Sequence, residues 1–280
     1  MRTIATRAEM RTLAGSLRSE GKRIGFVPTM GFLHDGHLSL MRKARLENDA
    51  VVCSIFVNPA QFGPTEDLDR YPRDAEGDRN KCASAGVDVL FLPAASEMYP
   101  EGPAAFVTVD GVSDILEGAI RPGHFRGVAT VVAKLFHIVQ PHRAYFGQKD
   151  YQQCVVVRRM VAGLDLDVEV TVLPTVREPD GLAMSSRNVY LDPEQRRRAA
   201  ALSRALRAGA ELLASGVREA EKVRQAMRTV LLAEQGVAVD YAEVADPDTL
   251  TPLESVRGRA VLLVAARVGP TRLIDNLLVL

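Results

Sequence analysis

Short apolar runs alternate with amphipathic segments from residue 1 to about residue 175. The apolar runs are 24–27, 50–57, 87–93, 106–109, 143–146 and 168–174. Between them lie segments with helical spacing of apolar residues, for example residues 38–47 and about 127–139. Strands separated by helix-length crossovers predict a mainly parallel sheet, and nearly continuous apolar strands are typical of sheets covered on both faces. We therefore predict an α/β fold with a Rossmann-like parallel-sheet domain over residues 1–175.

The pattern changes after this domain. Residues 174–188, PTVREPDGLAMSSRN, are polar and marked by Pro and Gly, which predicts a hinge or linker. Two long helical patterns follow, at 193–215 and 218–234, and then three strand-like runs at 237–244, 260–268 and 271–279. We predict a second, smaller α+β C-terminal domain over residues 176–280, close to the common domain size of about 100 residues.

Composition excludes several classes of protein. The chain has 280 residues and a formal net charge of +0, whereas modules that bind nucleic acid usually carry a basic excess. The N-terminus has no continuous apolar core of a signal peptide, and the longest apolar run, near residue 260, is too short to span a membrane. The three cysteines, Cys53, Cys82 and Cys154, lie far apart without a CxxC pair, which favours reduced thiols that pack in the interior. We expect a soluble, cytoplasmic protein without nucleic-acid or membrane partners.

Residues 28–37, PTMGFLHDGH, follow the apolar run 24–27 and precede a helical pattern. They therefore form a strand-to-helix turn, and in open α/β sheets ligands bind at the carboxyl ends of the strands. Gly31 permits close approach of the backbone to a ligand, and a helix N-terminus offers free N–H groups to phosphate oxygens. His34 and His37 share one face if the first turn is helical, with no side chain at Gly36 beside them. Two imidazoles placed in this way can donate hydrogen bonds to a pentacoordinate phosphorus.

Other interpretations of this spacing remain open on the residues alone. Two exposed histidines at a helix start would have no function, and two zinc ligands would need partners that the sequence does not reveal. Other phosphate-binding or nucleophile motifs are absent: there is no GxGxxG or GxSxG, and residues 15–23, GSLRSEGKR, depart from a P-loop in spacing and in having Arg23 at its Ser/Thr position. The run Arg196–Arg198 lies on a helical pattern and indicates a solvated face.

The pattern PTMGxLHxGH resembles the HIGH-type motif of adenylyl-transferring Rossmann-like enzymes, which include nucleotidyltransferases and class I aminoacyl-tRNA synthetases. More narrowly, the chain resembles the pantothenate synthetase (pantoate–β-alanine ligase) family in several blocks that occur in the same order. These blocks are PTMGFLHDGHLSL (28–40), SIFVNPAQFGPTEDLDRYPR (54–73), EGAIRPGHFRGVATVVAKLF (117–136), FGQKDYQQ (146–153) and GLAMSSRN (181–188). The departures are mild: Phe32 and Asp35 stand where the family varies, and Gln148 stands where many members have Glu.

The resemblance implies an ATP-dependent, AMP-forming amide synthesis. The pantoate carboxylate attacks the α-phosphate of ATP, which gives pantoyl adenylate and pyrophosphate. The amine of β-alanine then displaces AMP and gives pantothenate, the precursor of coenzyme A. The resemblance also implies Mg²⁺ with the ATP, and a homodimer.

The resemblance further implies roles for individual residues. It assigns catalysis to His37 as proton donor, to His34 as its partner at the phosphate, and to the cations Lys149 and Arg187. It assigns pantoate to Gln61 and Gln153, and β-alanine to Gln61 as well. The residues that it assigns to ATP binding are Met30, Gly31, Phe32, Leu33, His34, Asp35, Gly36, His37, Gly147, Gln148, Lys149, Asp150, Val176, Met184, Ser185, Ser186 and Arg187.

Some of these assignments have further consequences. MSSR (184–187) resembles the KMSKS-type loop of the same superfamily with Arg187 in place of a lysine, and its place in the hinge implies that the C-terminal domain acts as a lid. Asn58 is a further candidate for a polar contact. The metal ligands stay unassigned: Asp78 is a candidate, but a solvated helix residue is the favoured interpretation of this position.

Two other functions stand beside this one. A nucleotidyltransferase that joins AMP or CMP to a phosphorylated substrate would share the histidines and the lysine, but needs extra cations for the second phosphate. The amides of Gln61 and Gln153, together with RYPR (70–73), favour a carboxylate substrate instead. A nucleotide-sensing or scaffold protein would be expected to lose the reactive residues, yet all four candidates for catalysis are present. The neutral net charge disfavours a synthetase that binds tRNA.

Overall fold

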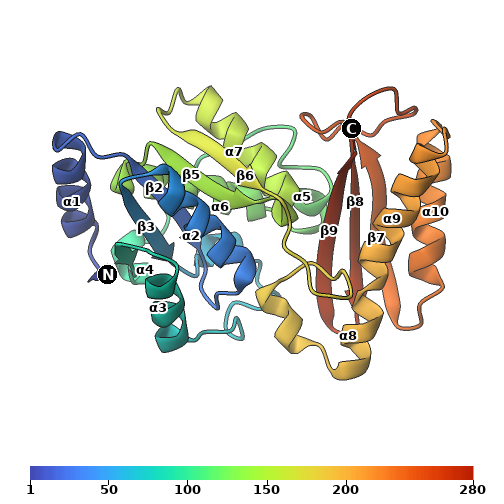
Figure 1. Ribbon diagram of the computed structural model, residues 1–280, viewed down its shortest axis with the longest axis horizontal. Helices are drawn as coiled ribbons and strands as arrows, with labels where there is room; N and C mark the ends of the chain where they lie inside the picture. The colour runs from blue at the N-terminus through green and yellow to red at the C-terminus, as the bar shows by residue number, and fades with distance from the viewer. Residues whose placement is uncertain (280) are drawn as a thin grey trace. The chain divides into compact units, whose positions relative to one another are not determined.

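The computed structural model describes residues 1–279, and the chain forms two compact units (Figure 1). The first unit consists of residues 1–147 and 152–174. The second consists of residues 148–151 together with the chain from residue 175 onward. The short segment 148–151 thus groups with the second unit, although it lies between two stretches of the first.

The first unit is built on a parallel sheet, as predicted. Its strand order is β1-β4-β3-β2-β5-β6, and every pairing in it is parallel. The chain order reverses between β2 and β5, so the carboxyl ends of these two strands form the topological switch point where open α/β sheets bind ligands. The strands are β1 (Arg2–Ile4), β2 (Ile24–Thr29), β3 (Ala50–Ile55), β4 (Val89–Phe91), β5 (Arg143–Gly147) and β6 (Glu169–Leu173).

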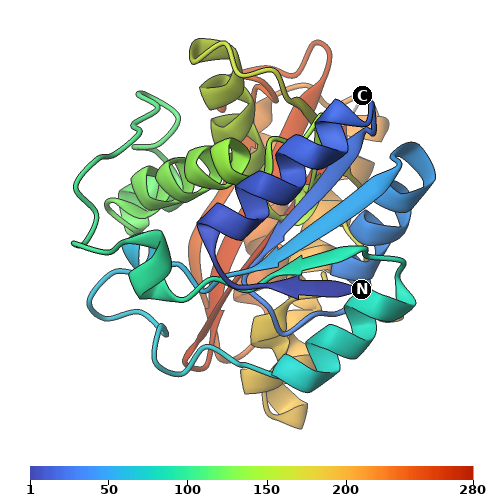
Figure 2. The same cartoon turned by 90° about the vertical axis from the view of Figure 1, so that its left-hand side faces the viewer.

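Helices cover both faces of this sheet (Figures 1 and 2). Val27 belongs to the core formed with α2 and α3, whereas the ring of its neighbour Phe26 packs edge-on against Phe136 of α6 at 6.4 Å. Successive strand residues point to opposite faces, so α2 and α6 lie on opposite sides of the sheet. The helices are α1 (Arg7–Ser19), α2 (Asp35–Glu47), α3 (Ala75–Ser84), α4 (Ala95–Met98), α5 (Glu117–Ile120), α6 (His124–Val139) and α7 (Tyr151–Gly163), with the 3₁₀ turns η1 (Pro59–Gln61) and η2 (Gln148–Asp150).

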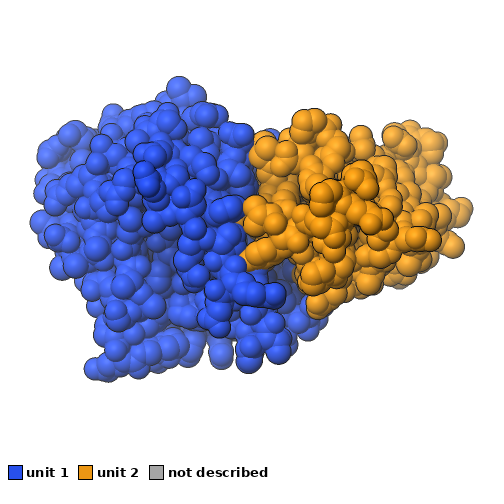
Figure 3. Space-filling view, turned by 90° about the horizontal axis from the view of Figure 1, so that it is seen from below, with its two compact units in different colours: residues 1–147, 152–174 blue, residues 148–151, 175–280 orange. Residues whose placement is uncertain are grey.

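The second unit, drawn in orange in Figure 3, packs helices on a three-stranded antiparallel sheet of order β7-β8-β9. The three strand-like runs predicted from the sequence form β7 (Val237–Ala245), β8 (Ala260–Val268) and β9 (Thr271–Val279). The first long helical pattern is interrupted at Ala200, which divides it into α8 (Pro193–Ala199) and α9 (Ala201–Ala214); α10 (Ala220–Leu232) is the second. The turn η3 (Ser186–Tyr190) precedes these helices. Among the described helices of both units, none has the length and apolar character needed to cross a membrane.

One predicted strand is wrong. Residues 106–109, FVTV, form no strand, and the ring of Phe106 is 45% exposed with the guanidinium of Arg126 at 4.5 Å from its centre. The backbone N–H of Val107 donates to Thr130 Oγ on α6 at 2.9 Å, so a side chain takes the place of a neighbouring strand. A short apolar run forms a strand only where a sheet edge is within reach. The short strand β1 and helix α1 were not predicted.

The three cysteines are reduced and buried, as predicted. Cys53 lies on β3 and Cys82 on α3, and both belong to the core on the α2 face of the sheet. Burial raises the pKa of the Cys53 thiol well above its ordinary value, so it remains protonated. These thiols contribute to packing.

Candidate active site

Helix α2 begins within the HxGH turn, three residues before the helical pattern that the sequence shows from residue 38. The helix starts at Asp35, so His37 lies inside its first turn and His34 is the N-cap. The Nδ1 atom of His34 accepts from the backbone N–H of Gly36 at 3.2 Å, and Nδ1 of His37 accepts from the N–H of His34 at 3.3 Å. The two rings stand 4.1 Å apart. The histidines thus take the part that Ser and Glu play in a capping box.

This capping decides which nitrogen of each ring carries the proton. A neutral imidazole has one N–H, and here Nδ1 of both His34 and His37 serves as an acceptor. The proton therefore lies on Nε2, which is a hydrogen-bond donor. Gly36 is required beside them, because a Cβ at this position would lie 2.9 Å from two atoms of the His34 ring.

Asp78 holds the turn that leads into these histidines. Its carboxylate is 2% exposed and accepts the backbone N–H groups of Phe32 and Leu33, both at 2.7 Å. Phe32 has a positive φ of 50°, next to Gly31 with φ of 89°, so the carboxylate stabilises a backbone conformation that non-glycine residues rarely adopt. The expectation that Asp78 is a solvated helix residue is wrong. The sequence could not reveal this role, because 45 residues separate Asp78 from Leu33.

Gln61 is brought against the same turn. Its side chain is 8% exposed, and its Nε2 donates to the sulfur of Met30 at 3.2 Å, so a candidate for pantoate binding touches a candidate for ATP binding. Asn58 donates from Nδ2 to Gln61 Oε1 and to the carbonyl of Gly127, each at 3.1 Å. The bond to Gly127 connects η1 to α6. Because Tyr99 Oη also donates to Oδ1 of Asn58, the amide of Asn58 is used within the protein rather than offered to a ligand.

A histidine that the sequence analysis did not single out fixes the backbone of Gln61. Burial, helped by the charge of Arg121, lowers the pKa of His124 to about 4, so the ring is neutral at pH 7. A carbonyl can only accept, so Nδ1–H of His124 donates to the carbonyl of Gln61 at 2.8 Å. Its Nε2 then accepts from Arg121, which also pairs with the carboxylate of Glu66. This network ties residues 61–66 to the start of α6.

The two glutamines at the start of α7 have different environments. Gln152 is 4% exposed, and its Nε2 donates to the carbonyls of Val112 and Ile115 at 2.7 and 2.8 Å. Its Oε1 accepts from the N–H of Glu117, so the whole amide is used in holding α5. Gln153 is only partly buried. Of the two amides, Gln153 is the one suited to a ligand.

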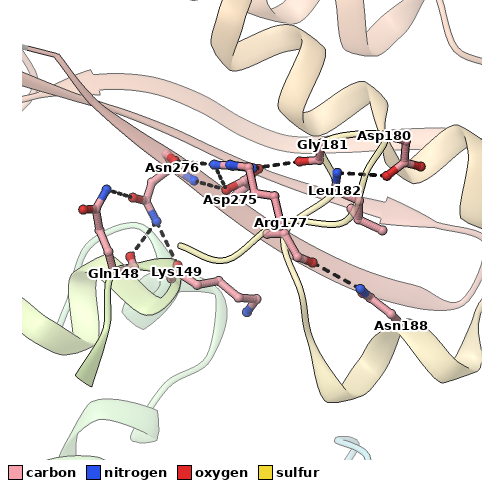
Figure 4. Close-up of polar contacts among 10 residues, drawn as sticks. Gln148, Lys149, Arg177, Asp180, Gly181, Leu182, Asn188, Asp275 and Asn276 are labelled. Atoms are coloured by element: carbon pink, nitrogen blue, oxygen red, sulfur yellow. Dashed lines mark hydrogen bonds and ion pairs between the residues drawn. The ribbon is translucent and has the colours of Figure 1, made fainter. Parts of the chain in front are cut away.

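In the second unit, Gln148, Lys149 and Asp150 form η2, directly after Gly147 at the end of β5. The ammonium of Lys149 is 3.2 Å from the carboxylate of Asp150, and its side chain is 20% exposed. The side-chain amide of Asn276 on β9 donates to the carbonyls of Gln148 and Lys149, both at 2.8 Å (Figure 4). The backbone that carries Lys149 is therefore fixed by β9.

The segment predicted as a hinge or linker is folded. The N–H of Met184 donates to the carbonyl of Val176 at 3.0 Å, and the N–H of Glu178 donates to the carbonyl of Leu182 at 2.8 Å. Residues 176–184 thus form a hairpin whose turn contains Gly181 with φ of 92°. Its returning arm leads into MSSR. The polar composition that suggested a linker is that of a tight turn.

The remaining residues of MSSR start the next element. Ser185 is the N-cap of η3, and its Oγ accepts from the backbone N–H of Arg187 at 3.3 Å. Ser186 is 7% exposed, whereas Met184, Ser185 and Arg187 are partly buried. Ser186 is therefore the least accessible member of the predicted ATP set in this loop.

No metal site is built from the side chains of residues 1–279: nowhere among them do three His, Cys, Asp or Glu residues gather closely enough to hold an ion. Both carboxylate oxygens of Asp78 accept backbone N–H groups, so this candidate already has partners. A magnesium ion would have to take most of its ligands from elsewhere.

Comparisons with known proteins agree with one another. The profile of the family described as pantoate-beta-alanine ligase matches residues 2–278. The chain belongs to this family. A pantothenate synthetase of Moorella thermoacetica is 57% identical over 276 residues, which cover 99% of this chain and 98% of the relative.

Solved structures of ligases from the same family extend the similarity to three dimensions. A crystal structure of pantothenate synthetase from Thermus thermophilus has 53% identity and a TM-score of 0.94, and covers 99% of each chain. A pantoate–β-alanine ligase from Francisella tularensis, solved as a complex with βγ-ATP and β-alanine, has 35% identity and a TM-score of 0.82, and covers 99% of this chain and 97% of its own. The family, the α/β fold class and the enzymatic nature predicted from the sequence are thereby confirmed.

Membership of the ligase family leaves the individual site residues as predictions. The structure brings Met30 and Gln61 together in the first unit, and Val176 and Met184 in the second. Sequence reasoning did not reveal what holds these segments in place: it considered Asp78 only as a metal ligand or a solvated residue, and it did not single out His124. A signal was present on β9, where two adjacent polar residues, Asp275 and Asn276, interrupt the apolar residues 273–274 and 277–279.

Proposed function

We propose that this protein condenses (R)-pantoate with β-alanine to pantothenate, using ATP and releasing AMP and pyrophosphate through a pantoyl-adenylate intermediate. The observation that carries this proposal is the HxGH turn, whose two imidazoles direct Nδ1 to the backbone and so hold their protons on Nε2. Two Nε2–H donors beside a helix N-terminus suit the α-phosphate of ATP, whose oxygens gain charge as the carboxylate attacks.

In the first step, a carboxylate oxygen of pantoate forms a bond to the α-phosphorus, and the bond from this phosphorus to the bridging oxygen of pyrophosphate breaks. His34 and His37 donate hydrogen bonds to the oxygens of the α-phosphate. Lys149 and Arg187 supply positive charge to the triphosphate as charge moves to the leaving pyrophosphate, Lys149 as a point charge and Arg187 as a fork. Residues 30–37 hold the nucleotide by backbone and imidazole contacts, and residues 147–150 contact it as well. Ser185 and Ser186 donate hydroxyl hydrogen bonds to it, and Val176 contacts its adenine or ribose through the backbone.

In the second step, the neutral amine of β-alanine attacks the acyl carbon of the adenylate, AMP leaves, and the nitrogen loses a proton. Gln61 and Gln153 bind pantoate, and Gln61 also contacts β-alanine. Neutral amides suit this task, because they bind hydroxyl and carboxylate groups without placing a cation on the nucleophilic carboxylate. The contact between Gln61 and Met30 supports the assignment, since it joins the pantoate candidate to the ATP turn.

Mg²⁺ enters the proposal as part of the substrate. Within the described residues 1–279 the chain supplies no cluster of metal ligands. An ion coordinated mainly by phosphate oxygens and water fits this donor set, because Mg²⁺ bound to nucleotides keeps most of its ligands outside the protein. Bound in this way, the ion neutralises phosphate charge.

The wider setting is part of the same proposal. The protein acts in the cytoplasm as a homodimer, and the C-terminal domain, residues 176–280, closes as a lid that shields the mixed anhydride from water. Closure is tested by small-angle scattering of the protein with and without ATP and pantoate. Compaction on binding supports the lid, and an unchanged radius of gyration argues against it.

The experiment that tests the activity measures two dependencies. Pyrophosphate release should require pantoate, and AMP release should then require β-alanine. The second candidate function, transfer of a nucleotide to a phosphorylated acceptor, gives the opposite pattern: pyrophosphate release without pantoate in the presence of that acceptor. If pyrophosphate release does not require pantoate and AMP release does not require β-alanine, the protein does not catalyse the ligase reaction.

A further inference from the structure

Two neighbouring residues of β9, Asp275 and Asn276, are buried although both are polar. Asp275 is 2% exposed and Asn276 is 1% exposed, in the middle of a strand whose other buried residues are Thr271 and Leu273. Successive residues of a strand point to opposite faces of the sheet, so these two adjacent positions of β9 present a carboxylate on one face and an amide on the other. Burying a polar group costs free energy unless it has hydrogen-bond partners, so both side chains are expected to be fully bonded.

Asn276 binds the segment that carries Lys149. Its Nδ2 donates to the carbonyls of Gln148 and Lys149, both at 2.8 Å, and its Oδ1 accepts from the side-chain amide of Gln148 at 3.2 Å (Figure 4). One amide thus uses both of its donor hydrogens and its acceptor on η2. The lysine side chain itself takes no part in these bonds, as Figure 4 shows.

Asp275 binds the hairpin that leads into MSSR. Arg177 forms a fork with it, Nη1 to Oδ2 at 2.6 Å and Nη2 to Oδ1 at 3.0 Å. The same guanidinium donates to the carbonyl of Gly181 at 3.0 Å and to the carbonyl of Asn276 at 3.2 Å. The N–H of Asn276 also donates to the Asp275 carboxylate, at 2.8 Å. Arg177 therefore links the turn of the hairpin to the buried carboxylate on β9.

We propose that Asp275 and Asn276 are positioning residues for the adenylation step: Asn276 sets the backbone of Gln148 and Lys149, and Asp275, through Arg177, sets the hairpin that presents Ser185 to Arg187. The proposal rests on the proposed function, because it assumes that Lys149 and Arg187 serve the nucleotide. Two adjacent positions of one strand then control two segments that are remote in the sequence and that the proposed function assigns to phosphate binding. Neither Asp275 nor Asn276 is proposed to touch a substrate.

The experiment uses amide hydrogen exchange and steady-state kinetics on the full chain. In Asn276→Leu, which keeps the branching and the number of side-chain heavy atoms but removes the hydrogen bonds, exchange in residues 147–151 should rise about tenfold, while exchange in 178–184 stays unchanged. Asp275→Asn should do the reverse. Both variants should lower kcat for pantoate-dependent pyrophosphate release about tenfold and leave the KM for pantoate unchanged, because a small misplacement of charge affects the transition state more than binding.

Matched variants guard against general loss of structure. Asp240→Asn removes the carboxylate partner of Arg272 elsewhere in the same sheet, and it should leave both segments and kcat within about twofold of the unaltered protein. If Asp275→Asn does not fold, Arg177→Lys tests the same arm, because it keeps a cation but loses the fork. Rises in exchange that are equal in both segments, or a kcat within about twofold of the Asp240 control, would overturn the proposal. Absence of pantothenate synthesis by the unaltered protein would instead refute the proposed function, and the exchange pattern would still decide the positioning role.

Discussion

Two buried aspartates, one in each unit, hold segments that carry candidate ATP-site residues, and they differ in what they bind. Asp78 accepts two backbone N–H groups of the HxGH turn. Asp275 accepts hydrogen bonds from the guanidinium of Arg177, and the same guanidinium donates to the carbonyl of Gly181 in the turn of the hairpin. The backbone N–H groups of Phe32 and Leu33 remain whatever their side chains are, so on this contact only the loss of Asp78 matters. The second arrangement depends on side chains as well, and loss of either Asp275 or Arg177 can disable it.

The largest effect is expected where each segment meets the reaction. His37→Ala and Lys149→Ala should each reduce adenylate formation at least about a hundredfold, on the scale of removing one donor to a transition state. His137→Ala and Lys222→Ala, at exposed positions, serve as controls and should leave the rate unchanged. The rate is measured as pantoate-dependent pyrophosphate release. A near-normal rate in either test variant would show that this residue takes no part in the reaction, and that only one of the two segments contributes a catalytic side chain.

The next effect concerns the turn whose N–H groups the Asp78 carboxylate accepts. Asp78→Ala leaves the N–H groups of Phe32 and Leu33 unpaired in the interior, so the free energy of unfolding should fall by about 3 kcal/mol, since a hydrogen bond to a charged group contributes about 1.5–3 kcal/mol. Chemical denaturation measures this change. A loss below about 0.5 kcal/mol would mean that the turn keeps its conformation without the carboxylate.

Gln153, a candidate for pantoate binding, is a useful contrast because it lies outside the two segments that Asp78 and Asp275 hold. Gln153→Ala should raise the KM for pantoate about tenfold and leave ATP binding largely intact, the size expected for losing hydrogen bonds to a charged group. Gln152→Ala, the matched variant, should lower the melting temperature instead, because its amide holds the carbonyls of Val112 and Ile115. Equal losses of pantoate and ATP binding in Gln153→Ala would contradict its role.

A smaller effect distinguishes the partners of the two carboxylates. In a double-mutant cycle, Asp275→Asn and Arg177→Met should be non-additive by about 1 kcal/mol or more, because removing one member of a buried ion pair leaves the other uncompensated. Asp78→Ala combined with Arg177→Met should be additive within about 0.5 kcal/mol. Additivity in the first cycle would show that the fork contributes little to the second unit.

The smallest effect is a pH dependence in the first unit. The pKa of His124 is lowered from 6.5 to about 4 in the folded protein, so between these values the unfolded chain binds a proton that the folded one does not. Stability should therefore fall as the pH drops from 6.5 towards 4, and this contribution is absent above pH 6.5. His124→Gln keeps a donor for the Gln61 carbonyl and an acceptor for Arg121, so melting temperatures at about pH 7.5 and about pH 5 should differ less in this variant. An identical pH dependence in both proteins would contradict the assignment.

The sequence predicted the parts of this molecule that depend on local pattern. The apolar runs at β2, β3, β5 and β6 are separated from one another by helix-length segments, and β8 and β9 have the predicted limits. The HxGH turn was likewise readable, because a strand, a glycine and a helix start are all local signals. The run 106–109 misled because its partner is a threonine on α6, which no local pattern reveals.

What holds the candidate site in place could not be predicted, for a physical reason. Asp78 looks like any charged residue of a helix until folding brings it to the N–H of Leu33. The hairpin at 176–184 has the composition of a linker, since turns and linkers share Gly, Pro and Asp. Only the polar pair Asp275 and Asn276 leaves a trace in the sequence, because buried polar residues break an apolar strand pattern.

The most direct test of the central claim follows a labelled atom. Pantoate that carries ¹⁸O in its carboxylate is converted with ATP and β-alanine, and the products are analysed by mass spectrometry. If the carboxylate attacks the α-phosphorus and the amine then displaces AMP, each turnover transfers one ¹⁸O to AMP and none to pyrophosphate. Unlabelled AMP, or release of ADP with labelled orthophosphate, would contradict the pantoyl-adenylate route and with it the roles proposed for both segments.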